Sequence, residues 1–311
     1  MTGRSILVLV LGLAILAGIV WAVWPKQTLG RGDILRAYAT PLDPPEGALR
    51  VFFLGHSLVG RDMPAMLAQL AGPGHGYESQ LGWGTSLREH FEPDLPINGF
   101  DVENDTPRYR DAKEALGSGD YDAVVLTEMV EIRDAIKYHE SGAYFAKWVA
   151  LAREGNPEVR VYLYESWPRL DDPEGWLERL DLDLERYWLG QVAAPALKAE
   201  PDRSVFVIPA GQVMAELVRR MEAGGLGTRE DLFQRRQDGT LDMIHVNDLG
   251  AYLVALTQYA VLYHRSPAGL SYELNRADGT PADAPAPALA RLMQEVAWQV
   301  ISAMPQTGVG G

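Results

Sequence analysis

The chain contains 311 residues, of which 47% are hydrophobic, so it can bury a full core. Its formal net charge of −14 argues against nucleic acid or an anionic lipid surface as the main partner. Because the chain has no cysteine, it can form neither a disulfide framework nor a thiolate metal site.

Residues 6–24 form an apolar run without a charged side chain. As a helix this run would extend roughly 28 Å, close to the ~30 Å hydrocarbon core of a bilayer. Signal peptides usually have an apolar region of about 7–15 residues, so the run is long for a cleaved signal, although Val20-Trp21-Ala22 fits a cleavage site. We therefore predict that residues 1–24 are a transmembrane anchor or an uncleaved signal. The bulk of the chain would then be membrane-anchored outside the cytoplasm, on the periplasmic or extracellular side.

Residues 25–49 are rich in proline, glycine and charge and are predicted to be a linker. From residue 50 onward, short apolar runs alternate with segments of helical periodicity. The apolar runs predict buried strands at 50–54, 77–82, 121–127, 159–165 and 204–208. Helical patterns occur at 63–70, 141–154, 176–199, 210–223, 249–259 and 289–303. This alternation predicts a three-layer α/β/α domain over residues 50–304 with a mostly parallel five-stranded sheet, followed by a flexible tail at 305–311.

Polar side chains follow several of the predicted strands. In a doubly wound sheet, ligands bind outside the carboxyl ends of the strands. The candidates at those ends are Ser57, the 82–86 loop, Thr127-Glu128 and residues 165–167. Ser57 ends the first strand abruptly, and it is either the N-cap of the next helix or a nucleophile.

A serine hydroxyl needs a base to accept its proton. Of the six histidines, His245 stands out because Asp242 precedes it by three residues in a segment expected to lead into a helix. Such a carboxylate can fix the tautomer of the imidazole and stabilise the imidazolium that forms. A D-x-x-H pair alone is weak evidence, but it becomes stronger together with a serine at the end of the first strand.

The order of these blocks resembles the SGNH hydrolases, the superfamily of GDSL-type esterases and lipases. That family has a Gly-Asp-Ser-Leu-like motif after the first strand, a glycine after the second, an asparagine motif after the third and a late D-x-x-H. The corresponding residues here are Gly55-His56-Ser57-Leu58, Gly82 or Gly84 in LGWGTSL, and Asp242 with His245. The resemblance extends over roughly residues 50–265 and implies a flavodoxin-like sheet.

The resemblance also implies the role of each residue. Ser57 would be the nucleophile, His245 the general base and Asp242 the residue that orients the base. The backbone N–H groups of Ser57 and of Gly84 or Gly82 would form the oxyanion hole. Glycine suits this role because it lets the backbone approach a ligand closely.

The third block departs from the family pattern, because VVLTEMV has Thr127 and Glu128 where the family has asparagine. An ionised Glu128 about 4 Å from an oxyanion would repel it by roughly 4 kcal/mol at an effective dielectric constant near 20. That repulsion matches the roughly 3–4 kcal/mol that one good donor contributes. Either Glu128 is protonated, or it points elsewhere while Thr127 donates, or the hole consists of two backbone amides.

Glu128, Glu165 and Trp167 are further candidates for substrate binding. Trp167 is interpreted as a stacking platform for a sugar, with packing beneath its loop as the alternative. His56 is expected to form a hydrogen bond in a neighbouring layer, and His90 to begin a surface helix or line a pocket. Dinucleotide, P-loop and zinc-protease motifs are absent, so we expect no metal and no cofactor.

Together these patterns predict a membrane-anchored serine esterase, a carboxylic ester hydrolase. It would remove small O-acyl groups, such as acetyl, from an ester or an acylated glycan through an acyl-enzyme. One alternative is an O-acyltransferase that passes the acyl group to a glycan hydroxyl. Another is a non-catalytic glycan-binding or assembly protein that keeps the fold. The sequence carries no signal for an oligomeric state.

Overall fold

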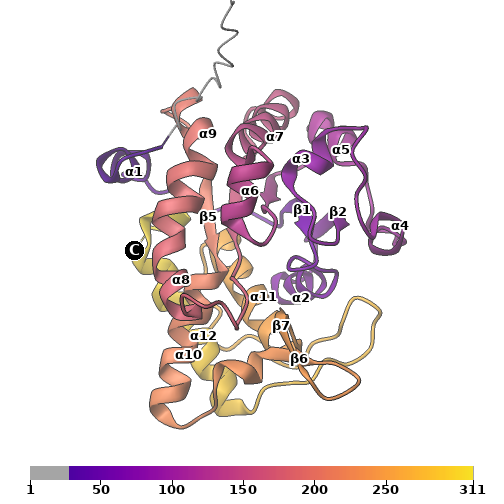
Figure 1. The fold of residues 1–311 in the computed structure, drawn as a ribbon, viewed down its shortest axis with the longest axis vertical. Helices are drawn as coiled ribbons and strands as arrows, with labels where there is room; N and C mark the ends of the chain where they lie inside the picture. Colours follow the sequence, from indigo (N-terminus) through magenta and orange to yellow (C-terminus); the bar gives the residue numbers. More distant parts are fainter. Residues whose placement is uncertain (1–27, 311) are drawn as a thin grey trace, which may run out of the picture.

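The computed structural model describes residues 28–310, and a five-stranded parallel sheet forms its centre (Figure 1). The strand order is β2-β1-β3-β4-β5. The strands are β1 (Arg50–His56), β2 (Gly76–Gly82), β3 (Ala123–Leu126), β4 (Arg160–Glu165) and β5 (Phe206–Pro209). All of these strands except β2 are largely apolar, because most of their side chains are buried on both faces of the sheet. The predicted five-stranded, flavodoxin-like sheet is confirmed.

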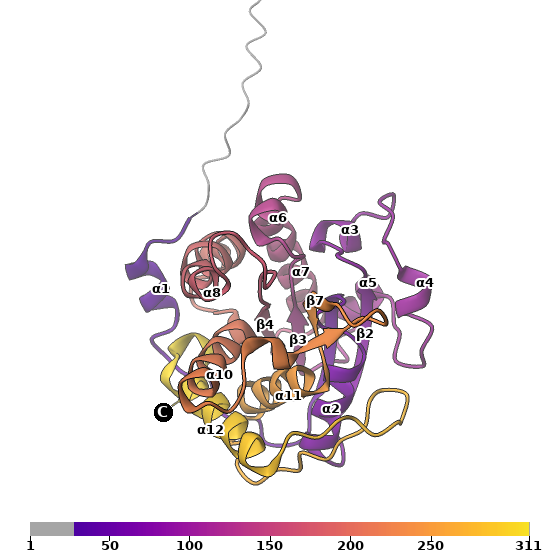
Figure 2. The same ribbon diagram turned by 60° about the horizontal axis from the view of Figure 1, so that its bottom comes forward.

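Helices cover both faces of this sheet and complete the predicted three layers. In Figure 2, α3 (Leu87–Phe91), α6 (Ile132–Tyr138) and α7 (Ser141–Gly155) lie above the strands. On the other side lie α2 (Asp62–Ala71), α10 (Ala210–Gly224) and α11 (Asp248–Tyr263). The remaining helices are α1 (Arg31–Ala37), α4 (Phe100–Glu103), α5 (Ala112–Ser118), α8 (Trp176–Asp183), α9 (Ala194–Ala199) and α12 (Pro287–Ala303), with a π-helix at Leu184–Ala193 and 3₁₀-helices at Arg229–Leu232 and Pro305–Thr307.

The long helices agree closely with the sequence pattern. The predicted segments 63–70, 141–154, 210–223, 249–259 and 289–303 correspond to α2, α7, α10, α11 and α12. The predicted segment 176–199 is helical throughout, but it consists of α8, the π-helix and α9 in succession. Helix α11 begins after Asn247, whose side chain accepts hydrogen bonds from the N–H groups of Leu249 and Gly250.

Two segments expected to be irregular are packed onto the domain. Part of the predicted linker forms α1, where Ile34 is buried, and the buried Tyr38 follows it and donates a hydrogen bond from its hydroxyl to the carbonyl of Val205. In the predicted flexible tail, Thr307 and Val309 are buried, and Gly308 accepts a hydrogen bond from the N–H of Leu42. Both segments therefore contribute to the core, because each brings apolar side chains to the same edge of the domain near β5.

The predicted fold class included an N-terminal transmembrane helix, and this part is corrected. Within residues 28–310, no helix has the length and apolar character needed to cross a bilayer. The segment expected to span the membrane, residues 6–24, lies outside the described residues.

The register of the sheet brings several loops to one edge. His56 pairs with Gly82 at the ends of β1 and β2, and Leu126 of β3 pairs with Leu54 and with Leu163 of β4. Because the strands are parallel, the residues that follow them all emerge at the carboxyl edge of the sheet. A short antiparallel ribbon, β6 (Phe233–Arg235) and β7 (Leu241–Val246), lies outside the main sheet and was not predicted.

Candidate active site

Ser57 directly follows β1 at the carboxyl edge of the sheet. The next helix does not begin at once, as the sequence suggested, because a turn occupies residues 57–61 before α2 starts at Asp62. The carbonyl of His56 accepts hydrogen bonds from the N–H groups of Val59 and Gly60, which fix this turn. Ser57 is therefore not the N-cap of α2, and its hydroxyl is available to other partners.

The structure brings Ser57, His245 and Asp242 together. The Oγ atom of Ser57 lies 3.0 Å from Nε2 of His245, although the two residues are 188 positions apart in the chain. On the other side of the ring, Nδ1 of His245 lies 3.2 Å from Oδ2 of Asp242. A carboxylate only accepts, so Nδ1 carries the proton and Nε2 is left to accept the proton of Ser57.

Asp242 and His245 lie on strand β7 rather than in a turn that leads into a helix. Oδ1 of Asp242 accepts hydrogen bonds from the N–H groups of Ile244 (2.9 Å) and His245 (3.0 Å). This local side-chain-to-backbone contact curls the strand so that residues three apart can meet. The D-x-x-H spacing thus has a direct structural reason.

These contacts also keep Asp242 ionised. Desolvation alone would raise the pKa of Asp242, but hydrogen bonds from the His245 and Ile244 N–H groups and from the imidazole outweigh it, and the pKa falls to about 2. The side chain of Arg236 adds a cation, with Nε 3.6 Å from Oδ2. Asp242 therefore carries a negative charge at neutral pH and can stabilise an imidazolium.

Ser57 and His245 face an open cavity of about 580 Å³. The residues that line it come from the ends of β1 and β2, from the loops after β3 and β4, from α4 and from the β6–β7 ribbon. They are His56, Ser57, Leu58, Trp83, Gly84, Glu103, Val130, Arg169, Gln234, Ile244 and His245. The cavity is large enough for a small ester substrate.

Backbone N–H groups are available beside Ser57. Among residues 28–310, those of Ser57 and Gly84 donate no hydrogen bond to protein, and both residues line the cavity. Gly82 lies deeper, where an added Cβ would approach Oγ1 of Thr85 to 2.2 Å, and it does not line the cavity. Of the two glycines that the motif offered, Gly84 is therefore the one beside Ser57.

Thr127 is not a donor toward this cavity. Its side chain is buried, and its hydroxyl donates a hydrogen bond of 2.8 Å to the carbonyl of Tyr164. Its methyl group packs where a Cβ on Gly55 would lie, only 2.4 Å away. The oxyanion role expected for Thr127 is corrected, because its hydroxyl already donates its proton to the carbonyl of Tyr164.

Glu128 points away from the cavity, which corrects its expected contact with substrate. Its side chain is fully buried, and Oε1 accepts hydrogen bonds from the N–H groups of Met129 (2.8 Å) and Leu87 (3.2 Å). Burial raises the pKa of Glu128 to about 7, although these hydrogen bonds act in the opposite direction. Glu128 thus ties the loop after β3 to the start of α3 and does not face the Ser57 hydroxyl.

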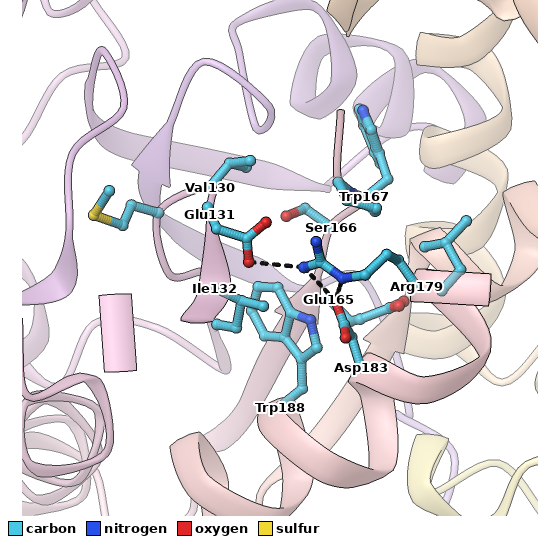
Figure 3. Close-up of a pocket in the computed structure, with 12 residues that line it drawn as sticks. Val130, Glu131, Ile132, Glu165, Ser166, Trp167, Arg179, Asp183 and Trp188 are labelled. Atoms are coloured by element: carbon cyan, nitrogen blue, oxygen red, sulfur yellow. Dashed lines mark hydrogen bonds and ion pairs between the residues drawn. The ribbon is translucent and has the colours of Figure 1, made fainter. Parts of the chain in front are cut away.

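Glu165 and Trp167 are also buried, next to a small cluster centred on Arg179 (Figure 3). Burial raises the pKa of Glu165 to about 8, and its carboxyl group accepts hydrogen bonds from the backbone and side chain of Gln212. The guanidinium of Arg179 forms ion pairs with Glu131 and Asp183. The cavity inside this cluster has a volume of only about 10 Å³, about enough for one water molecule, so Glu165 cannot contact a substrate there.

Trp167 cannot serve as the sugar platform that the sequence suggested, because its ring is only 2% exposed. Its indole Nε1 instead donates a hydrogen bond of 2.8 Å to the carbonyl of Ile244 on β7. This bond connects the loop after β4 to the strand that carries Asp242 and His245. Trp167 instead packs beneath its loop, which was the alternative interpretation of the sequence.

His56 and His90 both form structural hydrogen bonds. Nε2 of His56 donates to the carbonyl of Glu128 (2.9 Å), and Nδ1 accepts from the N–H of Leu58 (3.3 Å). Nε2 of His90 donates to the carbonyl of Gly55 (2.8 Å). Burial lowers the pKa of each ring to about 4, so both are neutral at neutral pH and brace the loop around Ser57.

Several cavity residues did not stand out in the sequence. Trp83 lies inside the glycine motif, but no spacing to another residue marked it as functional. Glu103 and Gln234 belong to short elements that were not predicted. Only the fold shows that they share one cavity with Ser57. Within residues 28–310, no group of three or more His, Asp or Glu side chains is arranged to hold a metal ion.

Comparison with known proteins supports the fold. No family model and no curated protein matches the sequence. Among solved structures, a DUF4886 family protein from Bacteroides uniformis aligns with a TM-score of 0.51 and 15% identity, over 82% of this chain and 95% of that chain. A putative GDSL-like lipase from Parabacteroides merdae aligns with a TM-score of 0.41 and 12% identity, over 70% of this chain and 96% of that chain.

An aryl esterase from M. smegmatis aligns with a TM-score of 0.36 and 13% identity, over 68% of this chain and 97% of that chain. One of these last two neighbours is thus named as a putative GDSL-like lipase and the other as an aryl esterase. At these identities the likeness concerns the fold alone. The functional argument therefore depends on the geometry around Ser57.

Proposed function

We propose that this protein is a serine ester hydrolase of the SGNH type that removes small O-acyl groups. The observation that carries the proposal is the chain of hydrogen bonds from Ser57 through His245 to Asp242, at the wall of an open cavity. A serine, a histidine and an aspartate that only stabilise the fold need not face an open cavity of about 580 Å³. Their position at the cavity wall therefore favours a catalytic role.

The geometry supports a two-step acyl-enzyme reaction. Nε2 of His245 takes the proton of Ser57 as Oγ attacks the ester carbonyl, and the imidazolium then protonates the departing alkoxide. In the second step His245 deprotonates a water molecule, which attacks the acyl-enzyme, and Ser57 leaves with its proton restored. Asp242 keeps the tautomer correct throughout and stabilises the imidazolium by its charge.

Two backbone amides would stabilise the oxyanion in this mechanism. The N–H groups of Ser57 and Gly84 both lie beside the cavity, and neither has a protein partner among residues 28–310. A carbonyl oxygen that becomes negative in the transition state would accept from both, and each such donor contributes roughly 3 kcal/mol. The buried Glu128 carboxyl group does not oppose this charge at close range, because Oε1 is turned to Leu87 and Met129.

The non-catalytic alternative loses its main support for the same reason. It depended on Glu128 taking the place of an oxyanion donor, whereas Glu128 does not line the cavity. The transferase alternative uses the same acyl-enzyme and differs only in the acceptor. The presence or absence of a sugar acceptor in the assay separates it from hydrolysis.

A fluorophosphonate probe tests the proposal on the purified protein. We expect covalent labelling of wild-type protein and no labelling of Ser57→Ala, with labelling retained in Ser86→Ala, a serine outside the cavity. Release of acetate from phenyl acetate should follow the same pattern. Absence of labelling in wild-type protein with a cooperative thermal transition would refute the proposal. Acetyl transfer to added glucose in preference to water would instead assign the transferase reaction.

A further inference from the structure

We infer that Trp83 sets the substrate preference of this cavity by binding the flat apolar face of a ring in the alcohol portion of the ester. The inference rests on the proposed function, because Trp83 lines the same cavity as Ser57 and His245. It names a chemical class, ring-bearing alcohols, that includes both aryl alcohols and the pyranose ring of a sugar.

Trp83 is exposed where other tryptophans are buried. Its side chain is 49% exposed, whereas Trp148, Trp167, Trp176 and Trp188 are at most 3% exposed. A single exposed apolar side chain is ordinary on a protein surface. Trp83 differs because its exposed surface belongs to the wall of a cavity that also holds a serine–histidine pair.

The ring of Trp83 is held in one orientation. Its indole Nε1 donates a hydrogen bond of 2.7 Å to Oε1 of Glu103, and its backbone N–H donates one of 2.7 Å to the carbonyl of Asn98. The backbone of Gly99, which has a φ of +69°, lies against the indole, and a Cβ at that position would come within 2.2 Å of Cδ2. Gly99 therefore covers part of the ring without a side chain.

A fixed aromatic ring suits ligand binding, because little side-chain entropy is lost when a ligand stacks on it. Glu103 and the Gly99 backbone support the indole, while its exposed half remains free toward the cavity. This arrangement differs from an indole that simply fills a gap in the core. It has the features of a preformed contact surface.

The other walls of the cavity carry polar groups that match a ring with hydroxyl or other polar substituents. Gln234 on β6 and Arg169 after β4 are both exposed and line the same cavity. An amide and a guanidinium can hydrogen-bond to polar substituents, while an indole face attracts an apolar ring face. A short linear alcohol would make neither the stacking contact nor the full set of polar contacts.

Three acetyl esters test the inference: phenyl acetate, methyl 6-O-acetyl-glucopyranoside and propyl acetate. We expect Trp83→Ala to lower kcat/KM by roughly tenfold for at least one of the two ring esters and to leave propyl acetate unchanged. Trp83→Phe, which keeps an aromatic face, should retain most of the activity on the ring esters. Tyr138→Ala, which removes an aromatic residue that is 58% exposed outside the cavity, is the matched control.

The pattern across substrates identifies the ring. A loss confined to phenyl acetate assigns an aryl alcohol, and a loss confined to the glucoside assigns a saccharide; both support the inference. Equal losses for all three esters would mean that Trp83 only shapes the loop around Gly84. Unchanged rates for all three would mean that it makes no substrate contact. Either of these results overturns the inference while the proposed ester hydrolysis stands.

A binding measurement keeps the two proposals separate if wild-type protein hydrolyses none of the esters. Titration calorimetry of Ser57→Ala with phenyl β-D-glucopyranoside requires no turnover. Binding that is lost in the Ser57→Ala/Trp83→Ala double variant supports the role of Trp83. Equal binding by both variants, or binding by neither, refutes it.

Discussion

Asp242 has two functions at the scale of a single residue, because each of its oxygens serves a different partner. Oδ1 accepts from the N–H groups of Ile244 and His245 and shapes the strand, and Oδ2 faces the imidazole. Asn at this position can keep the first function with its carbonyl oxygen. Its NH₂ group would face Nδ1 and favour the wrong tautomer of His245.

We therefore predict that Asp242→Asn lowers kcat by roughly 10³–10⁴-fold and lowers the free energy of unfolding by at most about 2 kcal/mol, the amount that the lowered pKa of Asp242 implies. The measurement is steady-state hydrolysis of phenyl acetate together with a thermal unfolding curve. Asp94→Asn, which changes an exposed carboxylate outside the cavity, is the control. A variant that keeps wild-type kcat would show that Asp242 only shapes the strand.

Glu128 provides a prediction about pH. The pKa of this buried carboxyl group is raised from 4.5 to about 7, so the folded protein keeps a proton that the unfolded chain has lost. Stability contributed by this group therefore falls as the pH rises from about 4.5 to 7. Gln at this position can still accept from Leu87 and Met129 but cannot ionise.

Relative to wild-type protein, Glu128→Gln should gain about 3 kcal/mol of unfolding free energy between pH 4.5 and pH 8, as follows from the shift of the pKa. Urea unfolding of both proteins at the two pH values measures this gain. Hydrolysis of phenyl acetate should be unchanged, because Glu128 lies outside the cavity. A difference in stability that does not depend on pH would contradict the assignment of the shifted pKa.

At the scale of elements, Trp167 links the loop after β4 to strand β7. Its indole hydrogen bond goes to Ile244, which lies between Asp242 and His245. We predict that Trp167→Phe lowers the free energy of unfolding by about 1 kcal/mol and lowers kcat without raising KM, because β7 loses a support. Trp167→Ala should cost about 3–5 kcal/mol, as is usual when a large buried side chain is removed.

Trp148→Phe is the matched control for this prediction. Its indole is equally buried and donates a hydrogen bond of 3.0 Å to the carbonyl of Leu87, away from β7. A similar loss of stability with unchanged kcat is expected there. If Trp167→Phe instead raised KM with kcat unchanged, the residue would contact substrate after all.

The elements also show what the sequence can predict. Apolar runs and helical stripes predict the long helices and the strands of the main sheet other than β2, because these elements are buried and their patterns are strong. The short helices α3, α4, α5 and α6 and strand β6 contain few residues, and β7 alternates weakly, so none carried a distinct pattern. The sequence did not predict that α1 and the C-terminal segment pack onto the domain. Each buries only a few side chains, and these stand among proline, glycine and charged residues that are typical of a linker or a tail.

The residues of the candidate site also differ in how far the sequence predicts them. Ser57, Asp242 and His245 belong to short motifs with defined spacing, so the sequence could nominate them. The directions of Glu128, Thr127 and Trp167 depend on neighbours from other elements, and no local pattern encodes those contacts. Glu103, Gln234 and Trp83 reach the cavity only through the tertiary fold.

At the scale of the whole molecule, buried titratable groups determine how stability depends on pH. Burial lowers the pKa of four histidines from 6.5 to about 4: His56, His75, His90 and His264. Between these values the unfolded chain binds more protons than the folded chain, so these residues make stability rise with pH. Burial raises the pKa of Glu128 to about 7 and of Glu165 to about 8, and these two groups act in the opposite direction.

We predict a stability maximum near pH 6.5. Below it the four histidines outweigh the two carboxyl groups, and above it the carboxyl groups act alone until about pH 8. Urea unfolding at half-unit steps from pH 4.5 to 8.5 measures the curve. Stability that continues to increase from pH 6.5 to 8 would show that Glu128 and Glu165 do not retain their protons in the folded protein.

The position of the β6–β7 ribbon has a consequence for how activity arises during biosynthesis. The proposed nucleophile follows the first strand of the sheet, whereas the proposed base comes from a ribbon beyond the fifth. A nascent chain that has not yet passed Leu241 already contains all five strands and Ser57, but it lacks His245, the group proposed to deprotonate this serine. Proteolytic fragments that end before this ribbon should be equally inert, so under the proposed mechanism ester turnover reports that translation and folding have reached the C-terminal part of the chain.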